Sequence, residues 1–210
     1  MRIGAFLKQS YIDWDGFVTA VVFTKGCNFR CGYCHNPYLV LPELMVQEPD
    51  VPQIDVINFL KDRVGWLDGV VITGGEPTIY GDLKQFIIGI KSLGYRVKLD
   101  TNGTNPSAVA ELLSERLVDY VAMDIKNELT VDGYRAITPN FSQRYLDCIL
   151  ETITFLRQSG VPYGFRTTLI NSIHTEKNIQ ELKHFLRKDE VHVFQEYREG
   201  VVVQNFVQQL

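Results

Sequence analysis

The sequence lacks several features that mark whole classes of protein. Its 21 Lys and Arg residues are outnumbered by 25 Asp and Glu residues, which gives a formal net charge of -4 at pH 7. The broad basic patch of a nucleic-acid-binding protein is therefore not expected. No apolar run approaches the length of a membrane span, and the first residues lack the apolar stretch of a secretory signal. We expect a cytoplasmic protein with no membrane partner, and a nucleic-acid partner is disfavoured.

Linkers, low-complexity segments and convincing internal repeats are also missing. The length of 210 residues, with 45% hydrophobic and 22% charged residues, is ordinary for one globular domain with a full core. We therefore expect a single domain over residues 1–210. It would consist of an N-terminal segment at 1–17, a β/α core at 18–197 and a C-terminal tail at 198–210.

Six short β-branched runs alternate with stretches of helical apolar spacing. The runs are residues 18–24, 69–73, 95–99, 119–124, 163–170 and 191–196. Pro52 and Pro106 stand where helices can begin, and Gly94 and Gly160 where helices can end. This alternation predicts an α/β fold with a parallel sheet and crossover helices. Six units are too few for a closed eight-unit barrel, so a partial (β/α)6 barrel or a doubly wound sheet fits.

Chemically unusual residues follow the ends of these predicted strands. The first strand leads into Cys27, the second into "GGEP" at 74–77, the third into "DTNG" at 100–103 and the fourth into "DIK" at 124–126. Arg166 lies in the fifth strand. Ligands bind where the strands of such sheets end, so we expect these residues to converge on one rim.

Cysteine is scarce outside one window. Three of the four cysteines lie at positions 27, 31 and 34, and the fourth, Cys148, stands in a helical stretch among apolar residues, where a small core residue is the better interpretation. A disulfide would leave an odd thiol and is disfavoured in the cytosol. A structural zinc ion needs four ligands, and His35, adjacent to Cys34, would be strained as the fourth. A 4Fe–4S cluster held by three cysteines would leave one iron open, as catalysis requires.

The window "CNFRCGYC" resembles the signature of the radical S-adenosylmethionine (SAM) superfamily, C-x3-C-x-aromatic-C. The resemblance implies that Cys27, Cys31 and Cys34 hold a 4Fe–4S cluster of the radical SAM type and that SAM binds the fourth iron. An electron from the cluster would cleave SAM to a 5′-deoxyadenosyl radical. Tyr33, the aromatic residue of the motif, would shield the cluster; its alternative role is loop packing.

The other rim motifs gain meaning beside this signature. Gly74 and Gly75 would let the backbone approach a ligand closely, and the Glu76 carboxylate could accept from an ammonium group; in the resembled superfamily this segment holds the SAM amino group. The forked donors of Arg166 suit a carboxylate, either that of a ligand or that of a salt bridge at the edge of the core.

"LDTNGT" and "AMDIKNE" resemble segments of the activating enzymes of glycyl-radical enzymes. That resemblance implies a polar site at Asp100, Thr101 and Asp124, which would hold a monovalent cation near the SAM carboxylate. It also implies that Lys126 reaches SAM and that Asn102 contacts its ribose. Taken alone, the Asn-Gly of the first motif is a common turn, and the Asp and Lys of the second form a solvated ion pair.

The first forty residues are similar to the activating proteins of anaerobic ribonucleoside-triphosphate reductases, on "CHNP" and the preceding "SYIDWDG". This resemblance implies an oxidoreductase that abstracts a glycine hydrogen from that reductase, with flavodoxin or ferredoxin as outside electron donor. The alternatives are a radical SAM enzyme acting on a small molecule or RNA (deazaguanine-forming or tRNA-modifying), and a non-catalytic zinc or electron-transfer module. We expect His35 to organise its loop, and His174, His184 and His192 to be surface or helix residues.

Overall fold

One seven-stranded sheet organises the chain. The computed structural model describes residues 1–207. The strands are β1 (Ile3–Ser10), β2 (Thr19–Thr24), β3 (Gly69–Gly74), β4 (Arg96–Thr101), β5 (Tyr120–Asp124), β6 (Tyr163–Leu169) and β7 (His192–Glu196). They are paired in sequence order, with β1 antiparallel to β2 and all later pairs parallel. All six predicted strands are confirmed, and β1, which lies in the predicted N-terminal segment, was missed.

The strand order distinguishes the two predicted architectures. A doubly wound sheet reverses its order at a switch point, whereas this order runs from β1 to β7 without a reversal. Among residues 1–207, no pairing joins β1 to β7. The sheet is therefore an open, partial barrel, as the sequence predicted.

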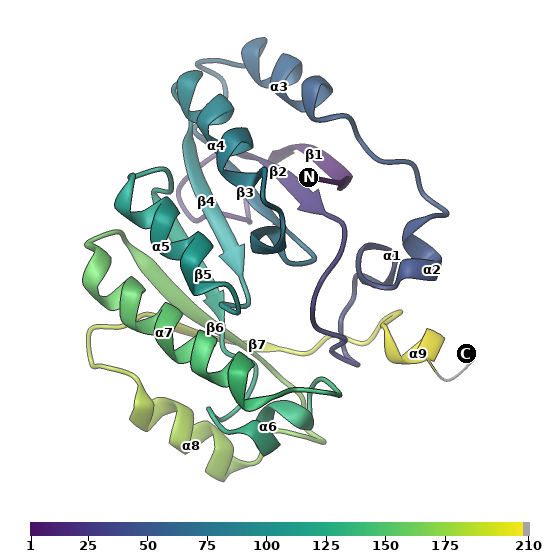
Figure 1. Ribbon diagram of the computed structural model, residues 1–210, viewed down its shortest axis with the longest axis vertical. Helices are drawn as coiled ribbons and strands as arrows, with labels where there is room; N and C mark the ends of the chain where they lie inside the picture. Colours follow the sequence, from purple (N-terminus) through teal and green to yellow (C-terminus); the bar gives the residue numbers. More distant parts are fainter. Residues whose placement is uncertain (208–210) are drawn as a thin grey trace.

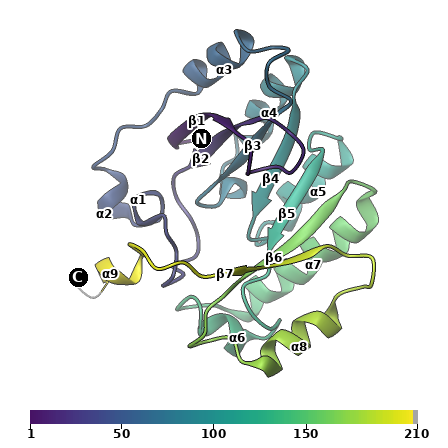
Figure 2. The same cartoon turned by 180° about the vertical axis from the view of Figure 1, so that it is seen from behind.

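The helices follow the strands along the chain. They are α1 (Pro37–Val40), α2 (Pro42–Met45), α3 (Gln53–Lys61), α4 (Leu83–Ser92), α5 (Pro106–Ser114), α6 (Val131–Arg135), α7 (Gln143–Ser159), α8 (Glu176–Phe185) and α9 (Gln204–Val207), with a 3-10 turn η1 (Pro77–Ile79). Figures 1 and 2 show α4, α5, α7 and α8 along the outer face of the curved sheet. Helices α1, α2 and α9 gather on another side, near the end of β2.

Local sequence explains the helix boundaries. Pro106 occupies the first turn of α5, where its missing N–H is not needed. Gly160 ends α7 with a φ of 67°, a left-handed conformation that glycine adopts without strain. The buried stripe of α4, which contains Phe86 and Ile90, packs into the core between helices and sheet. Within the described part of the chain, no helix has the length and apolar character needed to cross a bilayer.

A buried ion pair joins α7 to β6 and to the turn before β7. The Glu190 carboxylate, with its side chain 2% exposed, accepts hydrogen bonds from Arg157 Nε at 2.7 Å and from Tyr163 Oη at 2.8 Å. Burial by itself raises the pKa of Glu190, but the Arg157 guanidinium and the other donors outweigh it and lower the pKa to about 2. Glu190 thus contributes to stability as an anion.

We predict that Glu190→Gln lowers the free energy of unfolding by about 3 kcal/mol at pH 7. The folded pKa lies below the usual value of 4.5, so the contribution is complete above that value and is lost as the pH falls towards 2. In urea denaturation, the difference in unfolding free energy between wild type and variant should therefore become smaller as the pH falls from 4.5 to about 2. Glu151→Gln, an exposed change on α7, serves as control and should shift stability by less than about 0.5 kcal/mol. A pH-independent difference for Glu190→Gln would contradict the prediction.

Candidate active site

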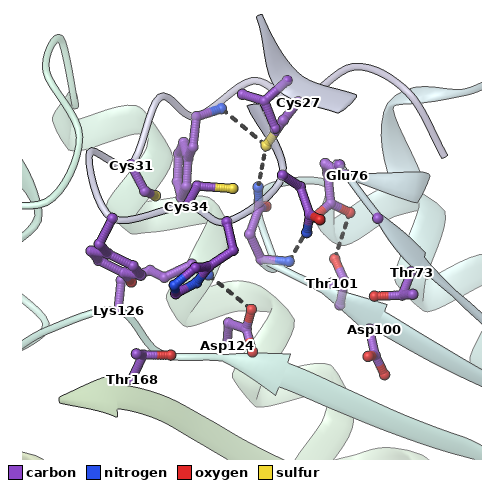
Figure 3. Close-up of a pocket in the computed structure, with 18 of the residues that line it drawn as sticks. Cys27, Cys31, Cys34, Thr73, Glu76, Asp100, Thr101, Asp124, Lys126 and Thr168 are labelled. Carbon is purple, nitrogen blue, oxygen red and sulfur yellow. Dashed lines mark hydrogen bonds and ion pairs between the residues drawn. The ribbon is translucent and has the colours of Figure 1, made fainter. Parts of the chain in front are cut away.

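A single cavity at the carboxyl ends of the parallel strands gathers every residue that the sequence analysis proposed for a site. The residues are Cys27, Cys31, Tyr33, Cys34, Gly74, Gly75, Glu76, Asp100, Thr101, Asn102, Asp124, Lys126 and Arg166. Figure 3 shows the cysteines on a loop over the strand ends, with Glu76 and Thr101 on one side of the cavity and Asp124, Lys126 and Thr168 on another. The predicted convergence of these residues on one rim is confirmed.

The three clustered cysteines are free thiols. Cys31 is 6% exposed, and the sulfur of Cys27 accepts a hydrogen bond from the Phe29 backbone N–H at 3.3 Å. Burial raises the pKa of Cys27 to about 12 and that of Cys31 to about 11. Both are therefore neutral thiols in the metal-free chain, and a metal that binds them must displace their protons.

An aromatic cluster packs against the loop of residues 25–36, which carries the three cysteines (the cysteine loop). The Phe29 ring, between two of the cysteines, contacts Phe141 and Tyr145 edge-on at centroid distances of 5.7 Å, and Tyr134 at 6.5 Å. Such pairs stabilise beyond the area they bury. The adjacent Arg30 N–H donates to Thr138 Oγ1 at 2.9 Å. The loop is thus anchored to the segment between β5 and α7.

The segment after β7 holds the same loop from the other side. The backbone N–H groups of Val203 and Gln204 donate to the carbonyls of Cys34 and Gly32, each at 2.9 Å. The Val203 side chain is 1% exposed and packs among apolar residues of α1 and α2. The predicted tail is therefore an ordered strap over the cysteine loop as far as residue 207. Residues 208–210 of that prediction lie outside the described part of the chain.

His35 has the organising role that the sequence predicted. Its Nε2 donates to the Arg198 carbonyl at 2.7 Å, and its ring stacks on Tyr197 at a centroid distance of 5.3 Å. His174 was wrongly assigned to the surface, because it is 7% exposed and bonded to backbone groups on both ring nitrogens. His192 lies in strand β7 and is half-buried, while His184 is exposed on α8 as expected.

Close contacts with neighbouring backbone atoms require glycine at both Gly74 and Gly75. A Cβ atom on Gly75 would lie 1.9 Å from the carbonyl oxygen of Gly26, and one on Gly74 would lie 2.4 Å from the Thr24 backbone nitrogen. Gly74 also has a φ of 108°, which side chains rarely tolerate. The sequence suggested close approach to a ligand. The structure shows close approach between the end of β3 and the start of the cysteine loop.

Glu76 is almost completely buried and accepts four hydrogen bonds. Its Oε1 accepts from the Thr78 N–H at 3.1 Å, the Thr78 hydroxyl at 2.6 Å and the Thr101 hydroxyl at 2.7 Å. Its Oε2 accepts from the Asn102 N–H at 2.6 Å. Burial raises the pKa of Glu76, although these donors oppose the shift. The carboxylate thereby joins the turns that follow β3 and β4.

A chain of charges crosses the ends of β4, β5 and β6. The Arg166 guanidinium lies 3.0 Å from both Asp100 and Asp124, and Lys126 Nζ lies 2.8 Å from Asp124. Burial by itself raises the pKa of Asp124, but Arg166 and Lys126 lower it to about 2. Burial lowers the pKa of Lys126, yet Asp124, Tyr33 and Cys31 raise it well above its usual value. Asp124, Lys126 and Arg166 are therefore ionised, and the cations on this side of the cavity are paired with carboxylates.

Several further residues of the cavity wall were not predicted from the sequence. Phe29, Asn36, Val40, Thr73 and Thr168 also line the cavity. The two threonines carry no motif; only their position near a strand end, Thr73 in β3 and Thr168 in β6, could have revealed them. Cys148 is half-buried in α7 and is not part of the cavity wall.

The cavity suits a cluster with an open iron and a polar ligand. Three free thiols line it without a fourth thiol, and within residues 1–207 no three His, Cys, Asp or Glu side chains are grouped to hold a single metal ion. A closed zinc site is therefore disfavoured. Two buried oxygens on the wall, Tyr33 Oη and Asp100 Oδ1, have no hydrogen-bond partner in the described chain; Asp100 Oδ1 has only an ion-pair contact with Lys98 at 3.4 Å. Such groups are normally satisfied by a ligand or water.

Comparison with known proteins identifies the class that this fold and site define. Residues 21–188 match the radical SAM superfamily, and the chain belongs to that superfamily. It is therefore an enzyme of the radical SAM kind, and membership supports SAM and a 4Fe–4S cluster as its cofactors.

Relatives in sequence indicate a group of enzymes within the superfamily. A protein of Methanocaldococcus jannaschii, provisionally named as a glycyl-radical enzyme activating enzyme, is 30% identical over 201 residues, covering 93% of this chain and 79% of its own. The pyruvate formate-lyase-activating enzyme of Clostridium pasteurianum is 29% identical over 194 residues, covering 89% of this chain and 76% of its own. The predicted resemblance to activating enzymes of glycyl-radical enzymes is confirmed.

Solved structures share the fold. Streptococcus suis SuiB aligns with a TM-score of 0.67 at 16% identity, over 90% of this chain and 45% of SuiB. The structure titled anSMEcpe with bound AdoMet has a TM-score of 0.62 at 18% identity, over 84% of this chain and 50% of that one. The chain spans about half the length of these two structures, and the likeness concerns the partial barrel alone.

We predict that Gly75→Ala lowers the free energy of unfolding by about 2 kcal/mol or more, because the new methyl group would collide with the Gly26 carbonyl. Gly81→Ala is the matched control: it lies in the same connection between β3 and α4, and an added Cβ meets nothing within 4 Å. The control should change stability by about 0.5 kcal/mol or less. Urea denaturation measures both, and equal losses for the two variants would show that the close approach is not required.

Proposed function

We propose that this chain is a radical SAM activating enzyme that installs a glycyl radical on an anaerobic ribonucleoside-triphosphate reductase. The observation that carries the proposal is the single cavity shared by three cysteine thiols and a paired cationic and acidic wall. The likeness to activating enzymes over almost the whole chain supports it. The choice of reductase rests on "CHNP" and "SYIDWDG" in the first forty residues.

Cys27, Cys31 and Cys34 would each ligate one iron of the cluster, leaving the fourth iron for SAM. A reduced 4Fe–4S cluster held by these thiols would supply one electron for the cleavage of SAM to methionine and a 5′-deoxyadenosyl radical, and hydrogen abstraction from the substrate glycine would follow. The described chain carries only one cysteine outside the window. The electron would therefore come from an external donor such as flavodoxin or ferredoxin.

The charged wall would receive the amino-acid end of SAM. Arg166 and Lys126 would offer donors to its carboxylate, and the buried Glu76 carboxylate would accept from its ammonium group. The backbone of Gly74 and Gly75 fixes the position of Glu76. Thr101 holds the Glu76 carboxylate through its hydroxyl.

Asn102 would contact the ribose and Tyr33 would cover the cluster. The Asn102 amide already donates to Asn28 Oδ1 at 2.9 Å, beside Cys27. The monovalent cation expected near Asp100 and Asp124 stays a prediction. The Arg166 guanidinium bridges those carboxylates in the structure, so the protein itself supplies positive charge there.

The test mixes the anaerobically reconstituted protein with SAM, a reductant and a candidate reductase. Electron paramagnetic resonance should show the doublet of a glycyl radical. A reductase in which the radical-bearing glycine is replaced by alanine should give no doublet. Absence of the doublet with the intact reductase, while SAM is cleaved, would refute this choice of partner.

A second candidate is a radical SAM enzyme that acts on a small molecule or RNA. The 7-carboxy-7-deazaguanine synthase of Neisseria meningitidis serogroup B is 32% identical over 114 residues, covering 54% of this chain and 46% of its own. This reading requires substrate-dependent formation of 5′-deoxyadenosine without any partner protein. The activating enzyme instead requires the reductase for hydrogen abstraction.

We predict that Cys31→Ala abolishes SAM cleavage and lowers the iron content from about four per chain. The loop around Cys31 would keep its aromatic anchor, so the barrel should stay folded by circular dichroism. Cys148→Ala is the control and should retain both iron and SAM cleavage. A fully active Cys31→Ala variant would contradict the assignment of ligands.

A further inference from the structure

The backbone of Lys126 is fixed on both sides at the point where the chain leaves β5. Its N–H donates to Tyr134 Oη at 3.2 Å, and its carbonyl accepts from His174 Nε2 at 2.9 Å. Tyr134 is fully buried and stacks on Phe141 at a centroid distance of 4.6 Å. These two side chains therefore hold the backbone from which the Lys126 side chain extends into the cavity.

The hydrogen bonds of His174 define its tautomer. The Ile170 N–H donates to Nδ1 at 2.9 Å. Since a backbone amide only donates, Nδ1 carries no proton, and Nε2 must carry the proton given to the Lys126 carbonyl. The backbone N–H of His174 also donates to the Ile170 carbonyl at 2.8 Å. The imidazole thus closes the turn after β6 and uses its other nitrogen to hold the segment after β5.

A second contact joins the same two segments. Asn178 in α8 donates to Glu128 Oε2 at 2.9 Å. This contact lies toward the surface, whereas His174 is 7% exposed. His174 is thus the buried link between the turn before α8 and Lys126.

We propose that His174 is a positioning residue: its Nε2–H donor holds the Lys126 carbonyl and so directs the Lys126 ammonium toward Asp124 and the SAM carboxylate. The SAM part rests on the function proposed above. The Nε2–H donor holds Lys126 and thereby affects ligand binding. The Nδ1 acceptor holds the Ile170 N–H and thereby stabilises the turn. The two ring nitrogens therefore have separable effects.

Two substitutions separate these effects. The amide of Gln reaches the position of Nε2, so His174→Gln keeps a donor for the Lys126 carbonyl. Asn reaches only the position of Nδ1, so His174→Asn keeps the acceptor for Ile170 and loses the donor. His184→Asn, an exposed change on α8, controls for the loss of a histidine.

The primary measurement is amide hydrogen exchange of peptides covering residues 124–130 in the metal-free chain, which requires no SAM. Exchange should be about tenfold faster in His174→Asn than in wild type, because one buried hydrogen bond is lost. It should stay within about threefold in His174→Gln and His184→Asn. Equal rates in His174→Asn and His174→Gln, or no change in His174→Asn, would overturn the positioning role. Unfolding of both His174 variants, seen by circular dichroism, would likewise reject separable effects.

The second measurement is the dissociation constant for SAM of the reconstituted holoenzyme, by equilibrium dialysis. His174→Asn should bind SAM about five- to tenfold more weakly, and His174→Gln should bind it within about threefold of wild type. Faster exchange without weaker SAM binding would show that His174 holds the Lys126 backbone but does not influence SAM binding. A wild-type holoenzyme that binds no SAM would instead refute the proposed function, and hydrogen exchange would still decide the role of His174.

Discussion

The structure depends on a bridge between partly buried charges on three adjacent strands. The Arg166 guanidinium, in β6, lies between carboxylates that stand at the ends of β4 and β5. Removing charges from water is costly unless each is paired and hydrogen-bonded. The bridge therefore keeps the strand ends together while leaving a polar wall that faces the cavity.

The cysteine loop lies over this wall and is held from several directions. Phe29 anchors it to the aromatic cluster before α7, and Val203 and Gln204 hold it through backbone hydrogen bonds. Gly75 brings the turn after β3 against Gly26 at its start. Segments distant in sequence thus converge on a loop that has no regular structure of its own. The three thiols are thus held in position without a helix or strand to carry them.

Sequence reasoning succeeded where a residue's own neighbours determine its structure. The β2 and β3 runs are apolar on both faces, and this pattern identifies a covered parallel strand. Strand β1 was missed because it is an edge strand with several exposed residues and irregular pairing to β2. His174 was misplaced because its partners are backbone groups of Ile170 and Lys126, which no sequence pattern reveals. The role of the strap after β7 likewise arises only from tertiary packing.

The charges of the cavity also explain why residue types could be predicted better than their contacts. Arg166 and Lys126 keep Asp124 ionised, whereas burial pushes Glu76 toward its neutral form. A cationic group bound beside Glu76 would favour its charged form, and an anionic group would be attracted to Lys126 and Arg166. The two sides of the cavity therefore differ: one holds the buried Glu76 carboxylate, and the other holds cations that are paired with carboxylates. A motif identifies the carboxylates and cations, but only the register of β4, β5 and β6 decides which of them neutralise one another and which remain to attract a ligand.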